Sequence, residues 1–249
     1  MLLKNKIAVI SGAAGARGIG FRTAQLFAEH GAHVALLDLD AHAAQAAAQS
    51  IGPDHIGLAC DVADHAACQS AVAKVIEHYG RIDVLINNAG ITQPLKIMDI
   101  SGKDWDRVLD VNLKGILNLS QAVIPHMRAQ KSGSIACMAS VSGQRGGGVF
   151  GGPHYAAAKA GVMGLAKAMA RELGPDHIRV NSVAPGLIAT DITGDKLTDT
   201  MKEKIIEGIP LGRLGQTQDV AGIYLFLASD LSAYVTGATI DVNGGMLIH

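Results

Sequence analysis

The sequence lacks several patterns that mark large classes of protein. No apolar run approaches 18 residues, so we expect no membrane-spanning helix. The ten histidines are dispersed and form no HExxH motif, which predicts that the chain has no metal site. The three cysteines, Cys60, Cys68 and Cys137, have no CxxC spacing. This pattern is typical of free, buried thiols in a reducing compartment and argues against a disulfide framework.

The sequence also lacks an excess of charge of either sign, because 21 basic and 22 acidic residues give a net charge of −1. This balance argues against nucleic acid or a membrane surface as a partner. The first residues lead directly into an apolar strand pattern, so we expect no signal peptide and a cytoplasmic location. Aromatic residues make up only 4% of the chain, whereas 49% is hydrophobic. That composition favours a tightly packed α/β core.

Apolar strand patterns alternate with helical patterns along the whole chain. We expect strands at 6–11, 31–38, 54–61, 82–87, 134–140, 178–184 and 238–242, and helices at 21–30, 41–50, 64–79, 104–127, 155–171, 201–206 and 217–228. Continuous apolar runs are typical of parallel strands that helices cover on both faces. We therefore predict an α/β fold, a doubly wound, Rossmann-type parallel sheet of about seven strands, in a single domain over 1–249.

One long stretch has little regular pattern. Residues 187–213 mix Thr, Asp, Gly and Lys around the short helical pattern at 201–206. Irregular segments of this length in a compact domain often cover a ligand. We expect this segment to be a lid over a substrate.

A glycine-rich turn, Gly12-Ala-Ala-Gly-Ala-Arg-Gly-Ile-Gly20, lies between the first strand and the first helix. At such a turn, bare backbone N–H groups and the positive end of the helix both face an anion. The turn therefore predicts a pyrophosphate site, with Gly12, Gly18, Ile19 and Gly20 around it.

Asp38 ends the second strand, 18 residues after Gly20. A carboxylate in this place can accept hydrogen bonds from both ribose hydroxyls of an adenosine and would repel a 2′-phosphate. Leu39 and a second acid follow, so no basic residue there would bind that phosphate. Arg17 favours the opposite, because an arginine in the glycine-rich turn can reach a 2′-phosphate. Two acids outweigh one mobile cation, and we predict NAD rather than NADP as the cofactor.

Two more strand ends carry candidate cofactor contacts. Asp61 and Val62 end the third strand, where they can contact the adenine, although Asp61 can equally be a helix N-cap. The turn Asn87-Asn88-Ala89-Gly90 ends a central strand, where open α/β sheets bind ligands. Gly90 allows a ribose to approach the backbone closely.

Tyr155 and Lys159 are four residues apart in a helical pattern, so they lie on one face of the helix. The pKa of free tyrosine is near 10, so a tyrosine needs about 4 kcal/mol of help to exchange a proton at neutral pH. One ammonium about 4 Å away supplies about that much at an effective dielectric near 20. The pair is a candidate acid/base, although the spacing alone also fits a surface pair.

Together these residues resemble the short-chain dehydrogenase/reductase family over essentially the whole chain. The resemblance rests on the glycine-rich turn, Asn87-Asn88-Ala89-Gly90, Asn112, Ser140, Tyr155-x-x-x-Lys159 and Pro185-Gly186, all in the family's order. It implies that Tyr155 is the acid/base, that Lys159 lowers the Tyr155 pKa, and that Ser140 holds the substrate oxygen. Asn112 would anchor a water that relays protons to Lys159. The implied cofactor contacts are Gly12, Arg17, Gly18, Ile19, Gly20, Asp38, Leu39, Asp61, Val62, Asn88, Ala89, Gly90, Tyr155, Lys159, Pro185, Gly186, Ile188 and Thr190.

The sequence departs from the family pattern in three places. Ser11 stands where the family usually has threonine, a change that should matter little. Five residues separate Gly12 from Gly18, where the family usually has three. Ser140 lies 15 residues before Tyr155, about two more than is common, so we expect the loop 146–153 to bulge and reshape the pocket. Ser142 is therefore an alternative to Ser140. The candidate substrate contacts are Ser140, Gln144, His154 and Tyr155, with Gln93, Arg145 and Phe150 as further pocket candidates.

The resemblance implies an NAD(H)-dependent oxidoreductase that interconverts a secondary alcohol and a ketone, with a small molecule as substrate. The alternative within the family is a 3-oxoacyl-[acyl-carrier-protein] reductase that uses NADPH and docks its acidic carrier on Arg128 and Arg171. A dinucleotide-binding sensor without chemistry is the third hypothesis, which the filled catalytic positions disfavour. The family's usual homotetramer fits the apolar helix at 155–171.

Overall fold

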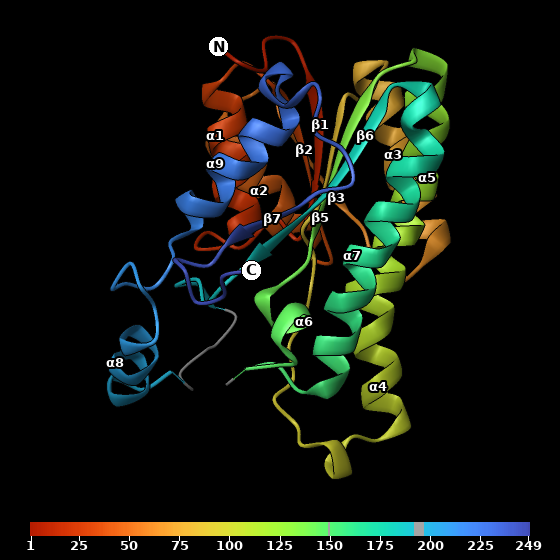
Figure 1. Ribbon diagram of the computed structural model, residues 1–249. Helices are drawn as coiled ribbons and strands as arrows, with labels where there is room; N and C mark the ends of the chain where they lie inside the picture. Colours follow the sequence, from red (N-terminus) through yellow and green to blue (C-terminus); the bar gives the residue numbers. More distant parts are fainter. Residues whose placement is uncertain (149, 192–196) are drawn as a thin grey trace.

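Seven parallel strands form one sheet at the centre of the protein (Figure 1). The computed structural model describes residues 1–148, 150–191 and 197–249. The strands are β1 (Ile7–Ser11), β2 (His33–Asp38), β3 (Ile56–Ala59), β4 (Val84–Asn87), β5 (Gly133–Met138), β6 (Ile178–Pro185) and β7 (Thr239–Val242). Their order is β3-β2-β1-β4-β5-β6-β7, and each neighbouring pair is parallel. The predicted Rossmann-type sheet is confirmed.

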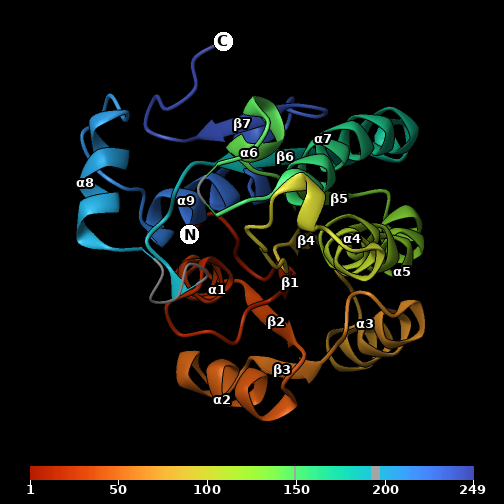
Figure 2. The ribbon, with the colours of Figure 1, turned by 90° about the horizontal axis from the view of Figure 1, so that it is seen from below.

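Helices cover both faces of the sheet (Figure 2). One layer consists of α1 (Ile19–Glu29), α2 (Ala41–Ile51) and α9 (Thr217–Ala228), and the other of α3 (His65–Tyr79), α4 (Gly102–Leu109), α5 (Gly115–Gln130) and α7 (Pro153–Leu173). Successive strand residues point into opposite cores: Val9 packs in the core with α3, α5 and α7, whereas Ile10 packs with α1 and α9. Both faces of each central strand are therefore buried, which explains the continuous apolar runs.

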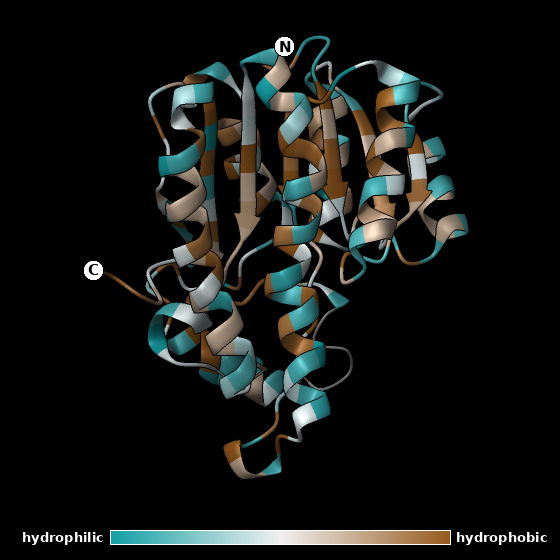
Figure 3. Cartoon of the chain, turned by 90° about the vertical axis from the view of Figure 1, so that its right-hand side faces the viewer, coloured by the Kyte–Doolittle hydropathy of each residue, from teal (hydrophilic) through white to brown (hydrophobic). Residues whose placement is uncertain are grey.

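Figure 3 shows the same pattern from outside, with hydrophobic colour concentrated on the strands and hydrophilic colour on the outward sides of the helices. Among the described residues, no helix has both the length and the apolar character needed to cross a membrane.

The helix expected over 104–127 is interrupted in the structure. A π-helical turn, Asp110–Lys114, separates α4 from α5, and Asn112 lies inside it. The Asn112 side chain donates through Nδ2 to the Val108 carbonyl at 2.9 Å. A side chain that takes a backbone carbonyl competes with regular helical bonding, so the prediction of one uninterrupted helix is wrong at this point.

Two shorter helices lie near the C-terminal edge of the sheet (Figure 1). α6 (Val141–Arg145) directly follows β5 and was not expected from the sequence. α8 (Asp199–Glu207) includes the predicted helical pattern at 201–206. In the expected lid over 187–213, residues 192–196 lie outside the described residues, and Ile188 forms a parallel β-bridge with Gly215. Its action as a lid stays a prediction.

The winding of the chain reverses between β1 and β4, which are neighbours in the sheet. The helix after β1 lies on one face, whereas the helices after β4 lie on the other (Figure 2). Ligands of open α/β sheets bind at such a reversal, beyond the carboxyl ends of the strands.

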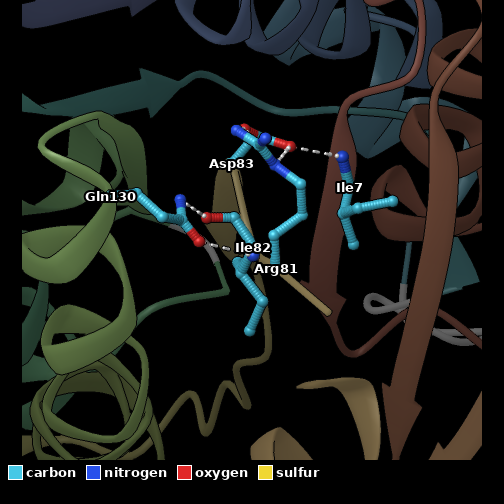
Figure 4. Close-up of polar contacts among 5 residues, drawn as sticks. All are labelled: Ile7, Arg81, Ile82, Asp83 and Gln130. Carbon is cyan, nitrogen blue, oxygen red and sulfur yellow. Dashed lines mark hydrogen bonds and ion pairs between the residues drawn. The ribbon is translucent and has the colours of Figure 1, made fainter. Parts of the chain in front are cut away.

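A buried carboxylate fixes the opposite, amino-terminal edge of the same two strands (Figure 4). Asp83, only 4% exposed, lies just before β4 and accepts a hydrogen bond from the Ile7 amide at 2.9 Å. Arg81 donates to the same carboxylate at 2.5 Å. Gln130, at the end of α5, bonds to both the amide and the carbonyl of Ile82, at 3.1 and 2.8 Å. These contacts join β1, β4 and α5.

We predict that Asp83→Ala lowers the free energy of unfolding by about 2–3 kcal/mol, because it leaves the buried Ile7 amide without an acceptor. Urea denaturation measures this change. Asp83→Asn keeps an acceptor oxygen of the same shape and should lose less stability. Equal losses in the two variants would show that the acceptor at position 83 does not carry the effect.

Candidate active site

A cavity of about 910 Å³ lies beyond the carboxyl ends of the strands. The loops after β1 to β6 contribute to its walls, together with α7 and α8. The cavity brings together most of the residues that the sequence singled out: Gly12, Gly18, Ile19, Asp38, Leu39, Asp61, Val62, Asn88, Ala89, Gly90, Asn112, Ser140, Tyr155, Lys159, Pro185, Gly186, Ile188 and Thr190. Their roles stay predictions, but their convergence is a property of the fold.

The glycine-rich turn needs glycine at two positions for packing. Gly12 has φ +62°, and a Cβ there would lie 2.8 Å from the Cα of Ala89. A Cβ at Gly20, which does not line the cavity, would lie 2.6 Å from the Gly12 carbonyl oxygen. Gly15, which the sequence analysis did not single out, differs because a Cβ there would meet nothing within 4 Å. Its backbone lines the cavity and is open to a ligand.

Hydrogen bonds join this turn to the end of β4. The Ser11 hydroxyl accepts from the amides of Asn88 and Ala89 at 3.0 and 3.1 Å. In return, the Asn88 side chain donates to the carbonyls of Ser11 and Gly12 at 2.9 and 3.0 Å. Asn88 therefore fixes the shape of the turn as well as lining the cavity.

Asp38 supports the turn from β2. Its carboxylate accepts from the amides of Ala14 and Leu39, at 3.0 and 2.8 Å. Arg17 does not line the cavity; its side chain is 80% exposed and forms an ion pair with Asp191, with Nε 3.0 Å from Oδ2. Asp191 itself lines the cavity, so the pair bridges the glycine-rich turn and the segment after β6.

The end of the cavity nearest β3 is bounded by Asp61 and Val62. The N-cap of α3 is Asp64, whose carboxylate accepts from the amides of Ala66 and Ala67 at 2.8 and 3.2 Å. The alternative interpretation of Asp61 as the N-cap is therefore wrong. Asp61 instead accepts from the Ala63 amide at 2.9 Å and lies at the cavity wall.

Tyr155 and Lys159 both project from α7 into this cavity. The Lys159 Nζ lies 5.7 Å from the centroid of the Tyr155 ring and donates to the Met138 carbonyl at 2.7 Å. Burial raises the pKa of Tyr155 above its usual value, and a hydrogen bond with Ser140 opposes that rise. Ser140 is the group that opposes this rise in the Tyr155 pKa. The role of Lys159 in lowering that pKa stays a prediction.

Lys159 is only 1% exposed, and burial lowers its pKa to about 7. An ammonium with that pKa gains and loses a proton near neutral pH. No carboxylate is among the groups that act on its pKa, so desolvation dominates.

Asn112 lies beside this lysine at the cavity wall. Its Nδ2 donates to the carbonyls of Ile91 and Val108, each at 2.9 Å, whereas its buried Oδ1 has no hydrogen-bond partner among the described residues. A Cβ at Gly90 would lie 2.7 Å from that Oδ1 and 3.5 Å from the Lys159 Nζ. Because position 90 is a glycine, a space remains beside both the Asn112 Oδ1, which can accept a hydrogen bond, and the Lys159 Nζ, which can donate one.

Ser140 and Ser142 both line the cavity, and their partners distinguish them. Ser140 is the N-cap of α6, accepts from the Ser142 amide at 3.1 Å and bonds to Tyr155. The Ser142 Oγ lies beside Gly151, 3.3 Å from where a Cβ would be. A Cβ at Gly143 would lie 2.6 Å from the Ala160 amide nitrogen, so this glycine lets α6 pack closely against α7. The geometry favours Ser140 as the serine that works with Tyr155.

Two candidate substrate contacts, Gln144 and His154, do not line the cavity. Gln144 donates to the Asp241 carboxylate of β7 at 2.7 Å. His154 is fully buried, with Nε2 3.0 Å from the Gln93 Oε1, and Gln93 donates in turn to Asp104 at 2.7 Å. These partners turn both side chains away from the cavity, so the geometry does not favour a substrate contact by either residue.

The cavity also contains residues that the sequence analysis did not select, among them Ile91, Asp191, Lys204 and Met246. Asp191 and Lys204 fall within the predicted lid at 187–213, whereas Ile91 and Met246 carry no motif, so only the fold reveals those two. Among the described residues, no group of His, Cys, Asp and Glu is arranged to hold a metal ion.

These features fit a dinucleotide cofactor. The N-cap of α1 is Gly18, and no side chain caps the helix, so its first N–H groups are free for a phosphate. The open backbone at Gly15 and the Asp38 carboxylate lie along the same wall. At the other end, Ser140 and Tyr155 present two hydroxyls to one space, as the reduction of a carbonyl oxygen requires.

We predict that Lys159→Met stabilises the protein by about 2–4 kcal/mol at pH 6, measured by chemical denaturation without cofactor. The unfolded lysine binds its proton more tightly than the folded one, so the stability of the parent chain rises as pH increases from about 7 toward 10.5. The gain from Lys159→Met should therefore shrink over that range. The exposed Lys167→Met on the same helix is the control and should show no such pH dependence; a gain that is constant with pH would contradict the prediction.

Comparison with known proteins agrees with the geometry. A family model described as enoyl-(acyl carrier protein) reductase matches residues 12–247. The chain is 68% identical to the short-chain type dehydrogenase/reductase y4mP of Sinorhizobium fredii, over 100% of both chains. It is 44% identical to the 3-oxoacyl-[acyl-carrier-protein] reductase FabG of Thermotoga maritima, again over 100% of both. A short-chain type dehydrogenase/reductase from Mycobacterium marinum superposes with a TM-score of 0.93 at 35% identity, covering 99% of this chain and 97% of the other. The chain belongs to the short-chain dehydrogenase/reductase family, whose members bind a nicotinamide dinucleotide and act on hydroxyl and carbonyl groups.

Proposed function

We propose that the protein is an NAD(H)-dependent oxidoreductase that interconverts a small secondary alcohol and its ketone, with Tyr155 as the acid/base. The observation that carries the proposal is that Ser140, Tyr155 and Lys159 line the same cavity as the glycine-rich turn. The cavity that contains both has a volume of about 910 Å³, which suits one extended cofactor with a substrate beside it.

In the reductive direction, the Tyr155 hydroxyl gives its proton to the substrate oxygen while Ser140 donates a hydrogen bond to the same oxygen. The bound nicotinamide supplies the hydride. Pro185, Gly186, Ile188 and Thr190 would hold the nicotinamide end, and the β-bridge between Ile188 and Gly215 fixes that backbone. In the oxidative direction, Tyr155 takes the hydroxyl proton instead.

The Tyr155 proton must be replaced after each turnover. Lys159 has a pKa near 7, so it can exchange protons at neutral pH. The Asn112 Oδ1 has no described partner and lies beside the space that Gly90 leaves next to the Lys159 Nζ. A water bound there would accept from Lys159 and donate to Asn112, which supports the predicted proton relay.

We propose NAD as the cofactor. Asp38 lines the cavity, and its charge would repel a 2′-phosphate at the ribose. Arg17, which could bind that phosphate, is engaged by Asp191. The position of Asp38 and the ion pair of Arg17 both support NAD over NADP.

The second candidate function is that of a 3-oxoacyl-[acyl-carrier-protein] reductase, which the 44% identity to proteins of that name supports. Docking of an acidic carrier would need exposed, unpaired basic groups. Arg128 instead donates to Asp176 and Glu172, each at 2.9 Å. Arg171, the other predicted docking residue, is exposed and forms no ion pair with a described residue. The pairing of Arg128 therefore weighs against carrier docking at one of the two predicted positions only.

We propose a homotetramer in the cytoplasm. Its support is the set of exposed apolar and small side chains on α4, α5 and α7, which suit close helix packing: Trp105 at 40% exposure, Leu117 at 39%, and the exposed Ala157, Ala160, Gly164 and Ala168. The three free, buried thiols suit a reducing compartment.

Tyr155→Phe should lower kcat by at least about 1,000-fold, because the variant keeps the ring but loses the transferable proton. NADH binding, followed by fluorescence titration, should change by less than about threefold. The exposed Tyr234→Phe is the matched control and should retain full activity. Parent-like turnover by the Tyr155 variant would overturn the mechanism.

For cofactor choice, we expect kcat/KM to be higher with NAD than with NADP. Asp191→Asn frees Arg17 and should raise kcat/KM for NADP by about two- to fivefold, since an exposed ion pair contributes up to about 1 kcal/mol. The value for NAD should stay within about twofold. Asp199→Asn, which removes an exposed acid of α8, is the control. A preference for NADP in the parent protein would mean that Arg17 outweighs Asp38.

A further inference from the structure

The charged residues that line the cavity are sorted by position. Asp38 and Asp61 follow β2 and β3, at the end where the proposed cofactor would place its adenosine. Arg145 is at the end of α6, which Ser140 caps at its start, and Lys204 is on α8; both line the cavity. The remaining two charged groups are Asp191, which is paired with Arg17, and the buried Lys159.

The acids have partners, whereas the two cations do not. Asp38 accepts from two backbone amides and Asp61 from one. Arg145 and Lys204 are both exposed, and their side chains form no ion pair or hydrogen bond with any residue that the structure describes. The substrate end of the cavity therefore carries positive charge that no described side chain balances.

Two other basic residues, Lys202 and Arg213, differ from Arg145 and Lys204 because each has an acidic partner. Lys202, two residues before Lys204 on α8, lies 3.6 Å from Asp199 and does not line the cavity. Arg213, near α9, donates to Asp219 at 2.7 Å. Lys202 and Arg213, which do not line the cavity, thus have acidic partners, whereas Arg145 and Lys204, which line it, have none among the described residues.

We propose that the substrate carries an anionic group, which Arg145 and Lys204 bind from opposite sides of the cavity. This inference rests on the proposed oxidoreductase function and names the substrate class for the same site. Arginine and lysine together suit a carboxylate or a phosphate, because the guanidinium supplies a planar pair of donors and the ammonium a mobile charge.

The position of Arg145 relative to the reacting oxygen limits the size of the substrate. Ser140 caps the start of α6 and Arg145 ends it. A helix rises about 1.5 Å per residue, so these two backbone positions lie about 7–8 Å apart. An extended arginine side chain covers much of that distance, so the anion can lie a few bonds from the ketone. A short oxo acid fits this separation, and so does a thioester whose phosphate extends to the cavity mouth.

The test compares matched anionic and neutral ketones with NADH. Acetoacetate is paired with methyl acetoacetate, and acetoacetyl-coenzyme A with acetoacetyl-N-acetylcysteamine, so the two pairs distinguish a carboxylate from a phosphate. We expect kcat/KM for the anion to exceed that for its neutral match by at least about tenfold in one pair, the contribution of a charge-assisted contact. Added salt should reduce this ratio.

Arg145→Gln and Lys204→Gln should each lower the anion-to-neutral ratio by about tenfold, mainly through KM. Lys202→Gln, on the same helix but outside the cavity, is the control and should leave the ratio unchanged. A second measurement does not depend on turnover: butyrate should inhibit competitively when acetoacetate is preferred, and less strongly in the two variants.

The outcomes separate the two levels of the proposal. Ratios near one in both pairs, or ratios that neither variant changes, would overturn the anionic substrate and leave the oxidoreductase function standing. Failure to reduce any of the four ketones, together with failure to oxidise the matching alcohols, would overturn both.

Discussion

The hydrogen bonds between the ends of β1 and β4 are the constraint on which the site depends. The helices that follow these two strands lie on opposite faces, which leaves an opening at the carboxyl edge of the sheet. Ser11 and Asn88 bond across that opening and hold the glycine-rich turn beside the exit of β4. At the amino edge, Asp83 joins the same strands, so both edges of the junction are fixed. The walls of the cavity are thus rigid where the proposed cofactor would lie.

The chemistry at the other end of the cavity depends on desolvation. Lys159 is buried without a carboxylate partner, and its one described hydrogen bond is to the Met138 carbonyl. This burial destabilises the ammonium, and the same effect brings its pKa to about 7, where proton exchange is fast at neutral pH. Tyr155 experiences the same low polarity, and Ser140 partly offsets it. The burial of Lys159 therefore affects both the stability of the protein and the proposed proton transfer.

Much of this arrangement is predictable from the sequence because the carboxyl ends of parallel strands meet at one edge. That rule alone brings Gly12, Asp38, Ser140 and Pro185 together, and the i, i+4 spacing adds Lys159 to Tyr155. It does not determine the direction of a side chain whose partner is distant in the sequence. Gln144 bonds to Asp241 and His154 to Gln93, contacts that no local pattern reveals. The same holds for Arg17, whose partner Asp191 follows a different strand.

The π-helical turn at Asp110–Lys114 has a consequence for how this chain can vary in length. Such a turn holds one more residue than the regular helix, and each helical residue advances the side-chain direction by about 100°. Deletion of a single residue here would restore an ordinary helix but rotate α4 against α5, carrying Asn112 away from Lys159 or Trp105 away from its present face. The extra residue sets the angular phase between the two helices, so insertions and deletions in this stretch are far less tolerable than substitutions.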